Sequence, residues 1–123
     1  MRSLRPEHRF VILSLGVHHP DECATLHFAE QCRALVKMPQ GNGRKVVAVA
    51  TTPCAREDNP AVADDVRNAA LRRQNAAFRA VAEELGLPFV DAHAMLEHAE
   101  HSAPTHFHRK SYIAPARAMA RAL

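Results

Sequence analysis

Two continuous runs of aliphatic residues constrain the fold of this chain most. The first is Phe10–Gly16 (Phe-Val-Ile-Leu-Ser-Leu-Gly) and the second is Lys45–Ala50 (Lys-Val-Val-Ala-Val-Ala). Strands that are buried on both faces have this composition, and such strands are typical of parallel sheets. The first run is also too short to cross a membrane. The two runs therefore predict neighbouring strands of a buried parallel sheet.

Segments with helical periodicity separate these runs. The sequence predicts a helix from Pro20 to Val36, a turn at Gln40–Gly43, and a long helix from Ala61 to Leu85 that Gly86 ends as a C-cap glycine. It then predicts a third strand over 87–91, a short helix over 92–101, a loop over 102–110 and a last helix over 112–123. Alternating strands and helices predict a three-layer α/β/α fold around a short parallel sheet.

Length and charge fit one soluble domain that spans residues 1–123. Of the 123 residues, 47% are apolar and 24% are charged, which is ordinary for a globular protein. The formal net charge is +3, but the Lys and Arg residues are scattered among acidic ones from Arg56 to Glu84. A nucleic-acid-binding protein needs a basic stripe with interleaved aromatic residues, and this sequence has none. We therefore expect no nucleic-acid partner.

The cysteines and the N-terminus bear on the compartment. Cys23, Cys32 and Cys54 are odd in number and form no Cys-x-x-Cys pair, which argues against a structural zinc knuckle and a closed set of disulfides. The first apolar run follows three arginines but ends in Gly-Val-His-His-Pro, which is not a small-residue cleavage site. Both features argue against secretion and favour the cytoplasm.

Histidines gather after two of the predicted strands. His18 and His19 follow the first strand, and five more follow the third: His93, His98, His101, His106 and His108. Parallel strands end at one edge of their sheet, where open α/β folds bind ligands. The sequence therefore predicts a histidine-lined site at that edge.

Three stretches, in this order, resemble the SGNH/GDSL-like hydrolase superfamily, and within it the PC-esterase-like acyl-esterases. Val11–His18 is similar to the strand that ends in Gly-x-Asn, or Gly-x-His in this branch. Leu85–Asp91 is similar to the Gly-x-Pro-hydrophobic-x-Asp strand, and Asn75 matches the helix before it. Thr105–His108, followed by Ser111-Tyr112, is similar to the Asp-x-x-His block.

The resemblance implies an acyl-ester hydrolase or O-acyltransferase-like domain that needs no cofactor and acts on a small-molecule or glycan acyl ester. It assigns the role of base to His106, with His108 as the alternative, because an imidazole takes a proton from a hydroxyl nucleophile. It places the N–H of Gly16 and the side chain of His18 as oxyanion donors, with His19 beside them in the substrate-binding region.

The sequence departs from the family pattern at the nucleophile and at the acid. No Gly-Asp-Ser block is present, and none of the four serines follows a strand into a glycine-rich turn: Ser3, Ser14, Ser102 and Ser111. The Asp position three residues before the base is Ala103 for His106, or Thr105 for His108. A triad without its acid loses several orders of magnitude in rate. We therefore expect a partial SGNH-like domain without its first βα segment, truncated or catalytically impaired.

Three other interpretations stay open on the sequence alone. A three-stranded sheet leaves exposed edges, so the chain could be a non-catalytic interaction module completed by a partner or by a second copy in a homodimer. His93, Glu97 and His101 would lie on one face of a helix, as in a histidine-rich metal-binding protein, although the outer two would be about 12 Å apart along its axis. Cys54 could act as a nucleophile with a nearby histidine as base.

Overall fold

The computed structural model describes residues 9–14 and 25–123 of the chain. Its main sheet has three strands in the order β1 (Phe10–Ser14), β2 (Lys45–Val49) and β3 (Phe89–Val90). The helices are α1 (Thr25–Gly41), α2 (Asp65–Glu84), α3 (Ala92–Leu96) and α4 (Ile113–Ala122). Between α3 and α4 lie the short strands β4 (His101–Ala103) and β5 (His106–Phe107), followed by the 3-10 helix η1 (Arg109–Tyr112).

Both strand pairs of the main sheet are parallel, as predicted. Val11 pairs with Val46, and Val49 pairs with Val90. The carboxyl ends of β1, β2 and β3 therefore meet at one edge of the sheet. An antiparallel β1–β2 pair would have removed the basis of the hydrolase interpretation.

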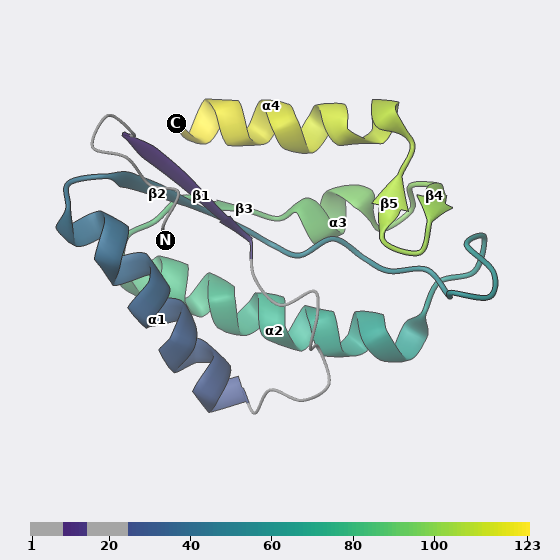
Figure 1. Cartoon of the computed structure of the whole chain (residues 1–123), viewed down its shortest axis with the longest axis horizontal. Coiled ribbons are helices and arrows are strands. Elements are labelled where there is room, and N and C mark those ends of the chain that lie inside the picture. Colours follow the sequence, from purple (N-terminus) through teal and green to yellow (C-terminus); the bar gives the residue numbers. More distant parts are fainter. Residues whose placement is uncertain (1–8, 15–24) are drawn as a thin grey trace.

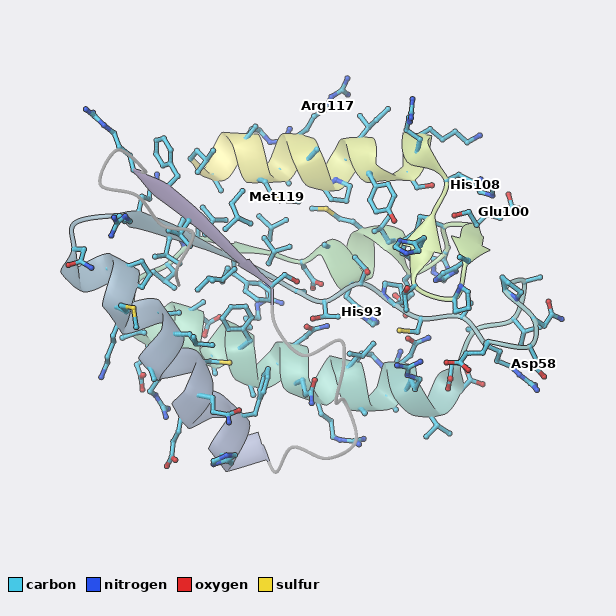
Figure 2. The ribbon with its side chains drawn as sticks, viewed as in Figure 1. Asp58, His93, Glu100, His108, Arg117 and Met119 are labelled. Atoms are coloured by element: carbon cyan, nitrogen blue, oxygen red, sulfur yellow. The ribbon has the colours of Figure 1, made fainter. Side chains whose placement is uncertain are left out.

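The residues of β2 alternate between two buried faces. Val46 and Ala48 pack against α1 and α2 on one face, and Val47 and Val49 lie beneath α4 on the other. Figure 1 shows this three-layer arrangement, with α4 on one side of the sheet and α1 and α2 on the other. In Figure 2, Met119 of α4 points toward the sheet whereas Arg117 points away. The predicted α/β/α class is thus confirmed.

The larger core lies between the sheet and the pair α1–α2. Helix α1 contributes one buried stripe at spacings of four residues, Phe28, Cys32 and Val36. Helix α2 contributes Phe78 and Val81 to the same core. Polar contacts join the same two helices at the rim: Arg33 forms a 2.7 Å ion pair with Glu84, and Gln40 Nε2 donates to the carbonyl of Leu85.

Two helix boundaries differ from those predicted, each for a local reason. Helix α1 continues beyond Val36 to Gly41, because Pro39 is accommodated in its last turn, where it is fully buried. Helix α2 begins at Asp65 rather than Ala61, because the Asp64 side chain caps it by accepting from the N–H of Arg67 (3.1 Å). Gly86, at φ +70°, has the left-handed conformation expected of a C-cap glycine.

The region after β3 was predicted incorrectly. Helix α3 ends at Leu96, not at residue 101, and the predicted loop over 102–110 contains the antiparallel β4–β5 hairpin. The His101 ring packs on the Phe107 ring at 4.1 Å, and this tertiary contact outweighs the helical pattern of the sequence. His93 and His101 therefore do not share a helix face, so the arrangement assumed for a metal site is wrong.

None of the helices in the described ranges is long and apolar enough to span a bilayer.

Candidate active-site edge

The segment that follows β2 forms the centre of the sheet's carboxyl edge. It runs from Ala50 to Ala55 and is largely buried, so its backbone groups need partners inside the protein. Figure 1 shows α3 and the β4–β5 hairpin beyond the ends of β2 and β3, on the same side of the molecule. This edge is where an open α/β sheet binds its ligands.

Two buried asparagines of α2 form hydrogen bonds to the backbone of this segment. Asn75 accepts from the N–H of Thr51 (2.8 Å) and donates to its carbonyl (3.0 Å). Asn68 makes the same pair of bonds to Cys54, at 2.7 and 2.9 Å. The sequence resemblance pointed to Asn75 but not to Asn68. The signal for it was spacing: the two asparagines are seven residues apart, which places both on the apolar face of an amphipathic helix.

Histidines complete the support of the same segment. His93 of α3 is buried, and its Nδ1 lies 2.9 Å from the carbonyl of Thr51. The Nε2 of His101 lies 3.1 Å from the carbonyl of Pro53. Both histidines thus have a ring nitrogen within hydrogen-bond distance of a backbone carbonyl of this segment. Within the described ranges, no three His, Cys, Asp or Glu side chains come together as a metal site would require.

Hydrogen-bond contacts connect the β4–β5 hairpin to the segment after β2. The N–H of Ala55 donates to the carbonyl of Pro104 (2.8 Å), next to the contact between His101 and Pro53. Phe107 is buried, and its N–H donates to the hydroxyl of Tyr112 at 2.8 Å. These contacts fix the position of β5 relative to the carboxyl edge.

His106 and His108 flank the buried Phe107 and are both exposed. Because side chains alternate along a strand, they point away from the side on which Phe107 is buried. Ala103 is the hairpin partner of His106, so the residue opposite this imidazole is an alanine. In Figure 2, His108 lies beside β5, well separated from His93. Gly16, His18 and His19 lie outside the described residues.

The alternative nucleophile Cys54 is a core residue. It is buried, and burial raises the pKa of its thiol above the usual value, while Arg67 nearby lowers it by less. A protonated thiol is a weak nucleophile. Among the described serines, Ser14 ends β1, Ser102 lies in β4 and Ser111 lies in η1. None of these three hydroxyls is hydrogen-bonded to His106 or His108.

The sequence matches no protein-family model, and no curated protein matches it. The fold does match solved structures. One is a catalytic mutant of an acetylxylan esterase from Geobacillus stearothermophilus, at 16% identity and a TM-score of 0.70, covering 92% of this chain and 58% of that chain. The fold is SGNH-hydrolase-like.

Two further structures agree with this SGNH-like fold. They are a lipase/acylhydrolase from Enterococcus faecalis (15% identity, TM-score 0.67, 92% of this chain and 60% of that chain) and the aryl esterase of M. smegmatis (19% identity, TM-score 0.68, 93% and 61%). This chain therefore spans about 60% of the length of the structures it matches. At these identities the similarity shows the fold alone.

Proposed function

We propose that residues 1–123 form one SGNH-like domain that carries the base of an acyl-ester hydrolase or O-acyltransferase site of the PC-esterase type. One observation supports the proposal: the β4–β5 hairpin is attached to the segment that follows β2 at the carboxyl edge of the sheet, and His106 of this hairpin is exposed. The esterases that share the fold support the same class of chemistry. A small-molecule or glycan acyl ester is the proposed substrate class.

In this scheme His106 takes the proton from a hydroxyl nucleophile as that hydroxyl attacks the ester carbonyl. The N–H of Gly16 and the side chain of His18 then stabilise the oxyanion of the tetrahedral intermediate, with His19 beside them. His106 returns the proton to the leaving alcohol. We favour His106 over His108 because Phe107 follows it directly and Ser111-Tyr112 come five and six residues later, the spacing on which the resemblance rests.

Ala103, the hairpin partner of His106, explains why we propose an impaired catalyst. An acid opposite the base would hold the imidazole in one orientation, and Ala103 cannot do so. The sequence also lacks a Gly-Asp-Ser block, so no serine is assigned the role of nucleophile.

Hydrolysis of p-nitrophenyl acetate tests the proposal. We expect slow turnover that His106→Ala removes and that His108→Ala leaves within about twofold. Ser102→Ala and Ser111→Ala serve as matched controls in the same hairpin and helix, and we expect both to keep the wild-type rate. Loss of turnover in His108→Ala with retention in His106→Ala would reverse the assignment of the base. Turnover as fast as that of an ordinary esterase would contradict the impaired catalyst.

One observation favours a second function, that of an interaction module. Within the described ranges β1 is an edge strand, and its Phe10 and Ile12 are 50% and 48% exposed. Apolar side chains on an edge strand favour pairing with another chain, including a second copy of this one. Light scattering tests this: a dimer that Ile12→Lys converts to monomer supports it, and a monomeric wild type contradicts it.

A further inference from the structure

A groove lies between α3 and the segment that contains η1 and α4. Its volume is about 640 Å³, within the roughly 300–1,000 Å³ that ligand-binding sites have. The lining residues that matter here are three apolar ones, Met95, Leu96 and Ile113, and three basic ones, Lys110, Arg117 and Arg121. The proposed hydrolase scheme gives none of these six residues a role, so a partner bound in this groove would add a second function to the chain.

The groove keeps large apolar side chains in contact with water. Leu96 is buried, whereas Met95 and Ile113 are 45% and 49% exposed. The opposite side of α4 packs on the sheet through Ala118 and Met119, so the exposure of Ile113 does not come from a loosely attached helix. An apolar side chain that entered the groove would remove Met95 and Ile113 from water, and such burial is the main driving force of most protein association.

The basic side chains of the groove are not neutralised. None of its described lining residues is acidic, and Lys110, Arg117 and Arg121 form no ion pair within the described ranges. In Figure 2, Arg117 points away from the sheet, and Glu100 lies beside the β4–β5 hairpin, well apart from it. Three positive charges in one groove equal the formal net charge of the whole chain, +3. The groove therefore attracts an anionic partner.

The spacing along α4 favours a helical partner. Ile113, Arg117 and Arg121 follow one another at intervals of four residues, so the two arginines are about 6 Å apart along the helix axis. Two carboxylates four residues apart on a partner helix have the same spacing, so a helix beside α4 can pair with both arginines at once. One turn further along, the same helix would place an apolar side chain next to Ile113.

Two other anionic partners fit the groove less well. A single-stranded nucleic acid needs aromatic side chains on which its bases stack, and the described lining offers Met95, Leu96 and Ile113 instead. A bilayer surface needs apolar side chains that protrude from the protein, whereas these line a concave surface.

We propose that this groove binds an acidic amphipathic helix of a partner protein. The apolar face of that helix lies against Met95 and Ile113, and its carboxylates pair with Arg117 and Arg121. Lys110, in η1, extends the positive surface at the other end of the groove. Because the contact area is small and the charge pairs stay close to solvent, we expect a Kd on the order of 100 μM.

Tryptophan fluorescence tests the proposal on the full chain, which has no tryptophan of its own. The probe is a peptide of about 14 residues, long enough to form a helix on binding, built from glutamate, alanine and leucine with one tryptophan in the middle of its apolar face. Its emission should shift to the blue saturably as the protein is added. A peptide of the same design with lysine in place of every glutamate is the control, and it should show no saturable shift. Affinity for the acidic peptide should fall several-fold between about 50 and about 500 mM salt.

Variants locate the binding site. The double variant Arg117→Gln, Arg121→Gln should weaken binding about tenfold, which is roughly threefold for each exposed charge pair. Ile113→Ala should weaken it several-fold through the loss of apolar contact. The double variant Arg72→Gln, Arg73→Gln is the matched control: it removes the same charge from two exposed arginines of α2, in the opposite layer, and should bind the peptide as the wild type does.

Three results would overturn the proposal. The first is no blue shift with the acidic peptide, or equal affinity for the acidic and the basic peptide. The second is equal weakening by the two double variants, which would reduce the effect to the overall charge of the protein. The third is binding of phosphatidylglycerol vesicles, but not of the peptide, that Arg117→Gln, Arg121→Gln removes; this result would assign the groove to a membrane surface.

Discussion

Asn68→Ala removes the side chain that satisfies the backbone of Cys54, and its cost can be worked out from the contacts. The N–H of Cys54 loses the acceptor Asn68 Oδ1 at 2.7 Å, whereas the carbonyl of Cys54 keeps the N–H of Asp64 at 3.1 Å. One buried donor is therefore left without its partner, and the desolvation penalty of such a group is about 1–3 kcal/mol. We expect the free energy of unfolding to fall by about 2 kcal/mol.

That loss should be visible in thermal unfolding. With an unfolding entropy of about 2.1 cal/mol/K per residue, a chain of 123 residues loses about 4 °C in Tm per kcal/mol. Asn68→Ala should thus lower Tm by about 8 °C in circular dichroism, with a matching loss in urea. Arg73→Ala, an exposed change on the same helix, should stay within about 0.5 kcal/mol of wild type. If Asn68→Ala were as stable as Arg73→Ala, the asparagine would not be holding the segment after β2.

Three further predictions concern the hairpin, a turn and the buried thiol. Tyr112→Phe removes the acceptor of the Phe107 N–H, so hydrogen exchange of that amide should accelerate at least several-fold while the amides of β2 keep their protection. Gly86→Ala should destabilise the protein by about 1 kcal/mol in urea unfolding, because an alanine is strained at the φ of +70° that this residue has. No steric clash adds to this cost, since no atom lies within 4 Å of the added Cβ. Gly86→Asn should cost less, because asparagine tolerates this conformation better. Burial raises the pKa of the Cys54 thiol in the folded state. Above pH about 8.5, the usual thiol pKa, the unfolded state therefore loses this proton before the folded state does. The free energy of unfolding should then fall as the pH rises. Cys54→Ala should flatten that decline, and an equal decline in this variant would assign it to other groups.

The strands of the main sheet were predictable from the sequence because their composition alone determines their environment. Val46 to Ala50 are apolar on both faces, and only a strand between two helical layers accommodates such a run. Gly86 was predictable for a similar reason, since a glycine at the end of an amphipathic stripe has one common role. Local patterns of this kind need no knowledge of the rest of the fold.

The region that carries the candidate site was not predictable in the same way. His101 was assigned to a helix, and 102–110 to a loop, because the sequence there has no strong period. Its structure depends on Pro53 and Ala55, which are about fifty residues earlier in the chain, and on the ring of Phe107. Asn68 was missed because a buried asparagine looks like an ordinary polar helix residue until the backbone that it serves is known. Both errors come from contacts between distant segments, which a periodicity does not encode.

The covering of Val47, Val49 and Val90 by α4 has a consequence for biosynthesis. The ribosome makes all three strands of the main sheet before it makes α4. One apolar face of the nascent sheet therefore stays uncovered until that helix leaves the exit tunnel. During that interval the growing chain offers a ready target for chaperones, and a pause in translation between β3 and α4 would prolong its exposure to aggregation.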